Sequence, residues 1–333
     1  MATVKTIKPG GGGDYTTLAA WEDWADGQAS ADQWAECYTG GDLGDVTLDG
    51  WTATPDATHY PRIYTPLSER HQGKLNTGAY VLGSVHSYVQ YTRVEGLRIE
   101  DDSATYWALH LCSPKGCVVD SNLVKPLNAA ASYVVGIGFE SLSAGNSGNI
   151  CRNNIVYGSK VPTNCYSVYC SATSTSSSSS DLTIDLYNNT VVNPSVYGFW
   201  VRESHRPGHP ATLTATASNN IAMDSGTKDF FKSIDYGSVT GSYNMSSDAT
   251  GDDWGATGSL INKVAANQFV DKASDWNLLS TANAIDAGTT IGSFDWDALH
   301  VDGDGWRPQG SAWDMGALER AVAKGRSFGV IIS

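Results

Sequence analysis

Apolar and polar residues alternate over short stretches of four to six positions along most of the chain. Each stretch is followed by a cluster of Gly, Asn or Ser. An alternation with a period of two predicts short β-strands, and the clusters predict turns between them. Helical periodicity is nearly absent after residue 35, so the pattern predicts an all-β chain.

A short sequence pattern recurs along the chain. It consists of an apolar residue, any two residues, Asn and a second apolar residue. Its Asn residues are Asn122, Asn154, Asn189, Asn220 and a weaker copy at Asn244, which are 32, 35, 31 and 24 residues apart. One Asn-Asn pair alone indicates a β-turn. A repeat of this length built of strands alone predicts a parallel β-helix, in which each repeat is one rung. Stacked Asn side chains then form a ladder at one turn, at the strand spacing of about 4.8 Å.

A second phrase follows in each rung, with copies at residues 108–111, 136–139, 167–170 and 198–201. Alternation places one set of side chains inward. This set is Leu109, Ile137, Val168 and Phe199, together with Leu111, Phe139, Cys170 and Val201. The same alternation places His110, Gly138, Tyr169 and Trp200 outward on one face, with Glu140 and Arg202 close by.

The two ends and one loop complete the expected layout. We expect a first strand at residues 4–7 and a short helix at 16–25, with Asp14 as its N-cap. An open coil exposes its terminal strands, so a helix there is expected to cap it. Residues 170–181 include a run of five serines and predict an exposed lateral loop.

Composition excludes several classes of protein. The net charge is -14, which is unsuited to nucleic acid or to an anionic membrane surface. Charged residues make up 17% of the chain, compared with about 25% in ordinary domains. The start of the chain has no signal-peptide pattern, so we expect folding in the cytoplasm and six cysteines that remain thiols.

No cofactor or metal is predicted. The four glycines at 10–13 are not followed by a phosphate-loop signature and indicate a turn. No cysteines have the C-x-x-C spacing of zinc sites. Asp302 and Asp304 resemble the start of a calcium loop, but position 12 of that loop is Trp313 rather than Glu.

Together with the Asn repeats, segments near both ends resemble right-handed parallel β-helix repeat proteins of the pectate-lyase-like superfamily. These segments are residues 12–21, 284–288, 302–310 and 313–319. The resemblance implies an all-β fold, a single-stranded right-handed parallel β-helix with a short N-terminal capping helix. We therefore expect a cap at 1–45, rungs at 46–250, C-terminal rungs and a closing segment at 251–319, and a docking tail at 320–333.

This superfamily includes lyases, hydrolases and inert virion proteins, so the fold does not identify the activity. Without an export signal, the chain resembles a tailed-phage member. Phage tailspikes are similar in fold but usually add an N-terminal particle-binding domain, for which this layout leaves no room, and a C-terminal trimerisation domain, for which only residues 320–333 remain. The leading hypothesis is a non-enzymatic virion component, a capsid decoration protein that binds the major capsid protein or another virion protein and forms a homo-oligomer, with a trimer favoured.

This hypothesis rests on the compact capped β-helix, the missing export signal and the tail. The tail is basic and then apolar, whereas the body is acidic, and we expect it to add to the sheet edge of a partner. The alternative is a last strand folded back on the body. The expected partner-binding residues are Arg320, Lys324, Arg326, Phe328, Val330, Ile331 and Ile332.

Two alternatives place the function on the β-helix itself. A polysaccharide lyase or glycosidase would use Glu203 and Glu140, with Arg202 and His205 nearby. A non-catalytic glycan-binding module would use the outward face formed by His110, Tyr169 and Trp200. For these aromatic side chains a subunit interface or cover by lateral loops ranks above sugar binding at this point.

Overall fold

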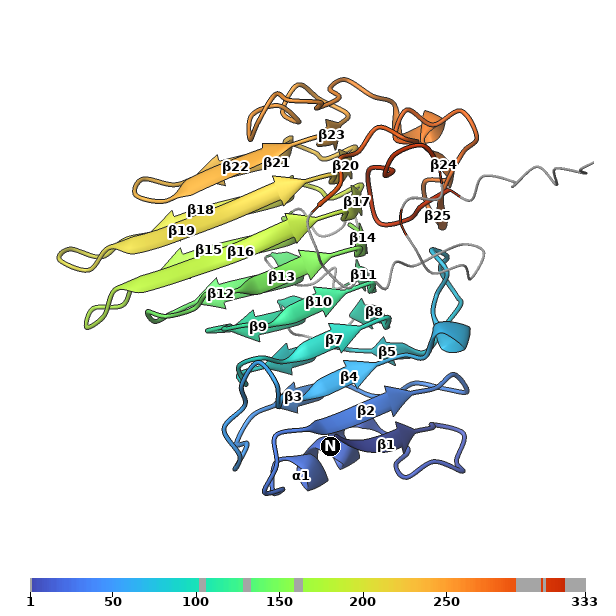
Figure 1. The fold of residues 1–333 in the computed structure, drawn as a ribbon, viewed down its shortest axis with the longest axis vertical. Coiled ribbons are helices and arrows are strands. Elements are labelled where there is room, and N and C mark those ends of the chain that lie inside the picture. The colour runs from blue at the N-terminus through green and yellow to red at the C-terminus, as the bar shows by residue number, and fades with distance from the viewer. Residues whose placement is uncertain are drawn as a thin grey trace, which may run out of the picture.

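The computed structural model describes residues 2–101, 106–127, 133–158, 164–291, 307 and 310–320. Within these ranges the chain forms a parallel β-solenoid of about seven turns, with three parallel sheets along the stack (Figure 1). We name these sheets A, B and C, and their strands are given below. The chain passes from sheet A to sheet B to sheet C and then returns to sheet A one rung further on. The prediction of an all-β fold made of parallel rungs is confirmed.

The bounds of the strands are as follows. Sheet A contains β1 (Thr3–Ile7), β2 (Gln33–Cys37), β4 (Arg62–Tyr64), β7 (Arg93–Glu95), β10 (Val118–Asp120), β13 (Asn149–Arg152), β16 (Ser180–Tyr187), β19 (Ala211–Ser218) and β22 (Ser238–Ser242). Sheet B contains β5 (Tyr80–Leu82), β8 (Arg98–Asp101), β11 (Leu123–Pro126), β14 (Ile155–Tyr157), β17 (Thr190–Val192), β20 (Ile221–Met223) and β23 (Met245–Ser246). Sheet C contains β3 (Val46–Leu48), β6 (Val85–Ser87), β9 (Trp107–Cys112), β12 (Val134–Ser141), β15 (Cys165–Thr173), β18 (Tyr197–Ser204) and β21 (Lys228–Ser233).

The predicted Asn ladder lies at the corner between sheets A and B. Each side-chain amide donates to the side-chain oxygen of the next Asn, from Asn122 through Asn154, Asn189 and Asn220 to Asn244, at 3.0 or 3.1 Å. Each amide also donates to a backbone carbonyl one rung back, as Asn154 does to Val119 at 2.9 Å. All five side chains are fully buried, so the ladder satisfies polar groups that water does not reach.

The residue before each ladder Asn turns the corner in the left-handed conformation. These residues are Ser121, Asn153, Asn188, Asn219 and Tyr243, with φ between 52° and 60°. In an earlier rung Gly96 takes the same role, with φ of 77°. Asn tolerates this conformation better than most residues. The Asn-Asn pairs therefore divide two tasks, with the first residue making the turn and the second building the ladder.

The core is a stack of side chains from equivalent positions in successive rungs. Leu109, Ile137, Val168 and Phe199 are lateral neighbours and are at most 1% exposed, as the alternation predicts. Phe199 stacks on Phe230 of the next rung, with ring centroids 5.0 Å apart and an interplanar angle of 5°. Rung-to-rung packing of identical positions fixes the register of sheet C.

The N-terminal segment differs in detail from its prediction. Helix α1 spans Leu18–Ala25, and the hydroxyl of Thr17, not Asp14, accepts a hydrogen bond from the backbone N–H of Ala20. The carboxylate of Asp14 instead accepts from the backbone N–H of Thr6, and this hydrogen bond, together with those from the side chains of Lys5 and Thr6, lowers its pKa to about 2. Asp14 was therefore the wrong cap, because its carboxylate is already used by β1.

The loop in the serine-rich segment is shorter than predicted. Strand β15 continues to Thr173 and β16 starts at Ser180, which leaves only residues 174–179 between them. The backbone N–H of Ser174 donates to the carbonyl of Ser204 at 3.0 Å, so the serines continue the pairing between rungs. The run of serines hid these strand ends, because Ser174 and Ser180 are buried in spite of their polar side chains.

The segment after β23 folds back along sheet B. It contains the 3₁₀ helix η2 (Ala265–Asn267) and the antiparallel strands β24 (Phe269–Asp271) and β25 (Asp275–Leu278), next to the ends of the sheet B strands in Figure 1. Its apolar side chains form one cluster with the outer face of sheet B. The backbone N–H of Ala317 donates to the hydroxyl of Thr190 at 2.8 Å, which ties the closing segment to that face. A second 3₁₀ helix, η1 (Leu67–Glu69), lies before β5.

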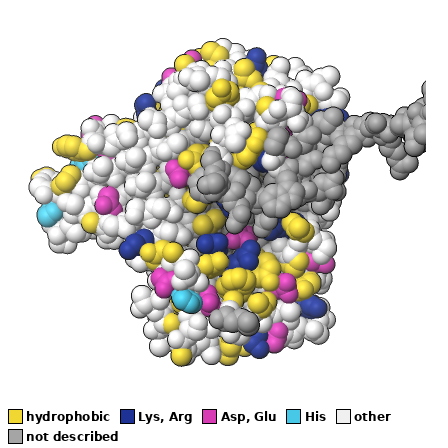
Figure 2. All heavy atoms as spheres, viewed as in Figure 1, with side chains coloured by type: hydrophobic (Ala, Val, Ile, Leu, Met, Phe, Trp, Pro, Cys, Tyr) yellow, Lys and Arg dark blue, Asp and Glu magenta, His cyan; other side chains and the backbone are white. Residues whose placement is uncertain are grey.

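Charged side chains of both signs are mixed on the face that Figure 2 draws. Figure 2 shows basic and acidic side chains beside one another among many uncharged ones. Some basic side chains are paired with a neighbouring carboxylate, as Arg152 is with Asp120 at 2.6 Å. Among the described residues no helix has the length and apolar character needed to cross a membrane.

Candidate functional site

The outer face of sheet C presents three rows of side chains that run across the strands. The first row is His86, His110, Gly138, Tyr169, Trp200 and Phe231. The second row is Trp107, Val135, Tyr166, Tyr197 and Lys228. The third row is Cys112, Glu140, Ser171, Arg202 and Ser233. The rungs are widest here, because β12, β15 and β18 have eight or nine residues whereas β3 and β6 have three.

The first row contains the predicted outward face of His110, Tyr169 and Trp200. Gly138 occupies the place between His110 and Tyr169 because the indole of Trp107 lies over it and a Cβ there would overlap that ring. Trp107 stacks on His110 with centroids 4.2 Å apart and lies 5.6 Å from Tyr169. His110 and Tyr169 are thereby 6% and 8% exposed, although they point away from the core.

The second row was missed by the alternation rule. Near the start of the long sheet C strands two successive residues are buried, as Ser167 and Val168 are in β15. The alternation of inward and outward side chains therefore shifts by one residue at this point. Tyr166, two positions before Val168, consequently faces outward with Tyr169. The signal was present in the sequence as a repeated spacing of three between aromatic residues, at 107 and 110, 166 and 169, and 197 and 200.

The aromatic rings of both rows form a continuous surface. Tyr166 lies 4.7 Å from Trp200, and Trp200 lies 5.0 Å from Tyr169 in an edge-to-face arrangement. Tyr197 stacks on Phe231 at 4.5 Å. Such contacts add to the free energy of burial and hold the rings in fixed orientations. The face is therefore a rigid platform.

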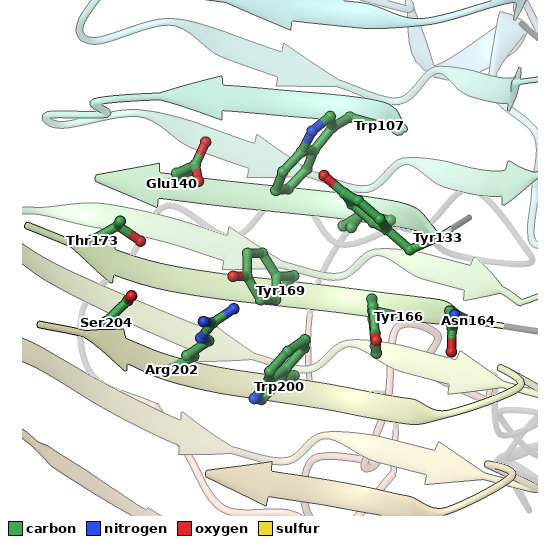
Figure 3. A pocket seen from close by; sticks show the side chains of 11 residues that line it. Trp107, Tyr133, Glu140, Asn164, Tyr166, Tyr169, Thr173, Trp200, Arg202 and Ser204 are labelled. Carbon is green, nitrogen blue, oxygen red and sulfur yellow. The ribbon is translucent and has the colours of Figure 1, made fainter. Parts of the chain in front are cut away.

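A hollow of about 530 Å³ lies over this platform. Its lining residues are Trp107, Tyr133, Val135, Glu140, Asn164, Tyr166, Tyr169, Thr173, Trp200, Arg202 and Ser204. Figure 3 shows Trp107, Tyr169 and Trp200 along the middle, with Glu140, Thr173, Ser204 and Arg202 along one side. The guanidinium of Arg202 lies 5.4 Å from the ring centroid of Trp200. The hollow therefore combines flat apolar rings with a row of polar groups, the composition typical of small-molecule sites.

Glu140 and Arg202, predicted as possible catalytic groups, both line this hollow. They are separated by one strand in the third row, which places their backbones about 10 Å apart at the usual strand spacing. Glu140 is the only carboxylate among the described lining residues.

Glu203 and His205, the other two possible catalytic groups, lie elsewhere. The Glu203 side chain is fully buried, and its carboxylate accepts backbone hydrogen bonds from Leu213, Asp235 and Tyr236 at 2.7, 2.7 and 2.8 Å. Burial alone raises the pKa of Glu203, but these N–H donors outweigh burial and hold its pKa below the ordinary value. Nδ1 of His205 accepts from the backbone N–H of Ala211, and Nε2 lies 3.4 Å from the Glu203 carboxylate. The structure therefore does not bring the four predicted groups together, and Glu203 holds two turns in place.

One group of possible metal ligands adjoins the hollow. His110, Cys112 and Glu140 place one ligand atom each within 4.8 Å of one another. Cys112 was not predicted as a site residue. The signal for it was His-x-Cys on one strand face, opposite Glu140 in the register of the next rung.

Most of the predicted docking tail lies outside the described residues. This applies to Lys324, Arg326, Phe328, Val330, Ile331 and Ile332, and in the closing segment also to Asp302 and Asp304. Arg320 is described, and its guanidinium donates to the carbonyl of Leu278 at 2.8 Å while its backbone N–H donates to Asp314 at 2.7 Å. The docking role of the tail stays a prediction.

Comparisons with known proteins add no relative to this geometry. No protein-family model matches the sequence, and no curated protein matches it.

Proposed function

We propose that the chain binds a glycan in the hollow on the outer face of sheet C. The observation that carries this proposal is the rigid aromatic platform, with Trp107, Tyr169 and Trp200 flanked by polar groups. Sugar rings present flat C–H faces that pack on aromatic rings, and their hydroxyls need hydrogen-bond partners when they leave water. The hollow offers both, and its size is within the usual range for ligand sites of about 300–1,000 Å³.

Binding without hydrolysis is the form that the polar groups favour. A glycosidase needs two carboxyl groups about 5–9.5 Å apart. Among the lining residues that are described, Glu140 is the one carboxylate, and the buried Glu203 is already saturated by backbone donors. Arg202 and Glu140 are suited instead to forming hydrogen bonds with two sugar hydroxyls, and the charge of Arg202 also suits an acidic sugar.

We infer that this platform stands on a right-handed coil. Connections between adjacent parallel strands of one sheet are right-handed in nearly all proteins, and the path from β7 through β8 and β9 to β10 is such a connection. Leu18, Trp21 and Ala25 of α1 are fully buried in the main core cluster, and Figure 1 draws α1 at the end of the stack beside β1. This supports a capping role for α1.

A glycan array with the purified chain tests the proposal. The Trp200→Ala variant removes a partly exposed indole that lines the hollow, and we expect binding to weaken about tenfold or more. Tyr88→Ala is the matched control, since Tyr88 is 55% exposed and does not line the hollow. The absence of any bound glycan, or equal binding by Trp200→Ala, would refute the proposal, and release of reducing ends would show an enzyme instead.

The virion hypothesis is a separate proposal. It rests in part on the tail, which lies outside the described residues apart from Arg320. A phage protein that decorates a particle and a glycan-binding face are compatible, because the tail and sheet C are different parts of the chain. Deleting residues 320–333 and measuring incorporation into particles tests the tail without touching the hollow.

A further inference from the structure

Three side chains of different chemistry converge at the edge of the hollow. His110 and Cys112 lie two positions apart on β9 and therefore share the outer face of sheet C. Glu140 is on β12, and its backbone is the lateral partner of Cys112. The His110 Nε2 atom lies 3.6 Å from a carboxylate oxygen of Glu140. The backbone register of the solenoid thus brings a nitrogen, a sulfur and an oxygen ligand to one point.

The imidazole of His110 is held in place but not satisfied. It is sandwiched by Trp107, whose ring is stacked at 4.2 Å, and by His86, whose ring is edge-on at 5.5 Å. His110 is 6% exposed, and its buried Nε2 atom makes no hydrogen bond within the described structure. A buried nitrogen without a hydrogen-bond partner destabilises the fold, and the nearest carboxylate oxygen, of Glu140, lies 3.6 Å away, so a ligand between them would satisfy both atoms.

The accessibility of the thiols singles out Cys112. Cys37, Cys117, Cys151, Cys165 and Cys170 are all fully buried, whereas Cys112 is partly exposed. An ion can therefore reach Cys112 from solvent, and Glu140 beside it lines the hollow.

We propose that His110, Cys112 and Glu140 bind a divalent ion of the zinc class. Imidazole, thiolate and carboxylate are the three ligand types of zinc sites, and harder ions such as Ca²⁺ or Mg²⁺ take oxygen ligands only. Zinc–ligand bonds of about 2.0–2.3 Å in a tetrahedron place ligand atoms about 3.3–3.7 Å apart. The distance of 3.6 Å between His110 Nε2 and the Glu140 oxygen already meets this requirement. All three ligand atoms lie within 4.8 Å of one another, so side-chain shifts of about 1 Å bring the remaining distances into the same range.

Three protein ligands leave one tetrahedral position open, as in zinc sites that hold water or a ligand. Because Glu140 also lines the hollow, the ion would lie next to the aromatic platform. The ion site goes beyond the proposed glycan binding and does not depend on it.

The test is a Co²⁺ titration of the full-length, tag-free, metal-free chain, without any glycan. We expect one equivalent to bind with a thiolate-to-cobalt absorption band that Zn²⁺ abolishes. Cys112→Ser should remove the band, and Glu140→Gln should weaken binding about tenfold or more. His59→Gln is the matched control, because His59 is an exposed histidine beside a carboxylate, 3.3 Å from Asp56, and should leave the titration unchanged.

A second measurement keeps the proposal falsifiable if a variant folds poorly. In the unmodified chain, Zn²⁺ should slow the alkylation of Cys112 by iodoacetamide, read by mass spectrometry of the peptide. Absence of the thiolate band, an unchanged band in Cys112→Ser, or alkylation that Zn²⁺ does not slow would overturn the proposal. The glycan array is a separate readout, so failure of one proposal does not imply failure of the other.

Discussion

Truncating one rung of the Asn ladder, by Asn189→Ala, should destabilise the fold far beyond the loss of a single contact. The Asn189 amide donates to the Cys151 carbonyl at 2.8 Å and to Asn220 at 3.0 Å. Its oxygen accepts from the backbone N–H of Asn154 at 3.1 Å and from the Asn154 side chain at 3.0 Å. The Asn154 side chain keeps its bond to Val119, but the Asn154 backbone N–H loses its acceptor.

The magnitude follows from the groups that are left without partners. The Asn154 N–H is stranded, the Cys151 carbonyl loses a donor, and the ladder is fully buried, so water cannot replace the missing amide. Each such group costs about 1–3 kcal/mol. We expect a loss of about 3 kcal/mol in the free energy of unfolding, measured by urea titration with far-UV circular dichroism.

The matched control is Asn267→Ala. Asn267 ends the short helix η2 and its side chain is exposed, so its truncation should change stability by less than about 0.5 kcal/mol. Hydrogen exchange at the Asn154 amide gives a local readout, since this proton should exchange faster in Asn189→Ala. Equal stability of the two variants would refute the view that the ladder stabilises the corner.

Two further predictions concern the platform and the N-terminal helix. Gly138→Ala should displace the indole of Trp107, change tryptophan fluorescence and weaken glycan binding, whereas Gly27→Ala, where a Cβ meets only an atom 3.9 Å away, should do neither. Burial raises the pKa of Glu22 to about 7. The folded chain therefore keeps a proton that the unfolded chain loses above about pH 4.5, so stability falls as pH rises toward 7 and the cost persists above it. Glu22→Gln should raise the melting temperature by about 2 °C or more at pH 8 and leave it unchanged at pH 4, while the exposed Asp23→Asn should show no such pH difference. An equal shift at both pH values would contradict the assignment to Glu22.

The sequence was sufficient to predict the parallel rungs because each rung repeats the same two physical requirements. The corner needs a residue that tolerates positive φ, followed by an amide that both donates and accepts, and these needs appear as pairs such as Asn188 and Asn189. The core needs apolar residues at alternate positions, which Ile137 and Phe199 supply. Since both signals recur in successive rungs, the Asn pairs indicate a repeated corner rather than isolated β-turns.

The site was only partly predictable, because local pattern and rung register carry different information. Alternation found Tyr169 and Trp200 but not Tyr166, since two adjacent buried residues shift the phase. Closeness in the sequence grouped Glu203 with Arg202, although successive residues on a strand face opposite sides. The meeting of Cys112 with Glu140 depends on the pairing of two rungs, which the sequence does not state.

The ladder also makes the rung an interchangeable unit of length. Each Asn passes a hydrogen bond forward and receives the same bond from behind, so the environment of Asn154 is the environment of Asn189 displaced by one rung. Duplicating a whole rung, such as residues 155–189, would preserve every amide partner and lengthen the outer face of sheet C by one strand. An insertion shorter or longer than a whole rung cannot keep the register of the strands, so it must project from the solenoid as a loop. Growth by tandem duplication is thus built into this architecture, and the breadth of its outer face can change without redesign of the core.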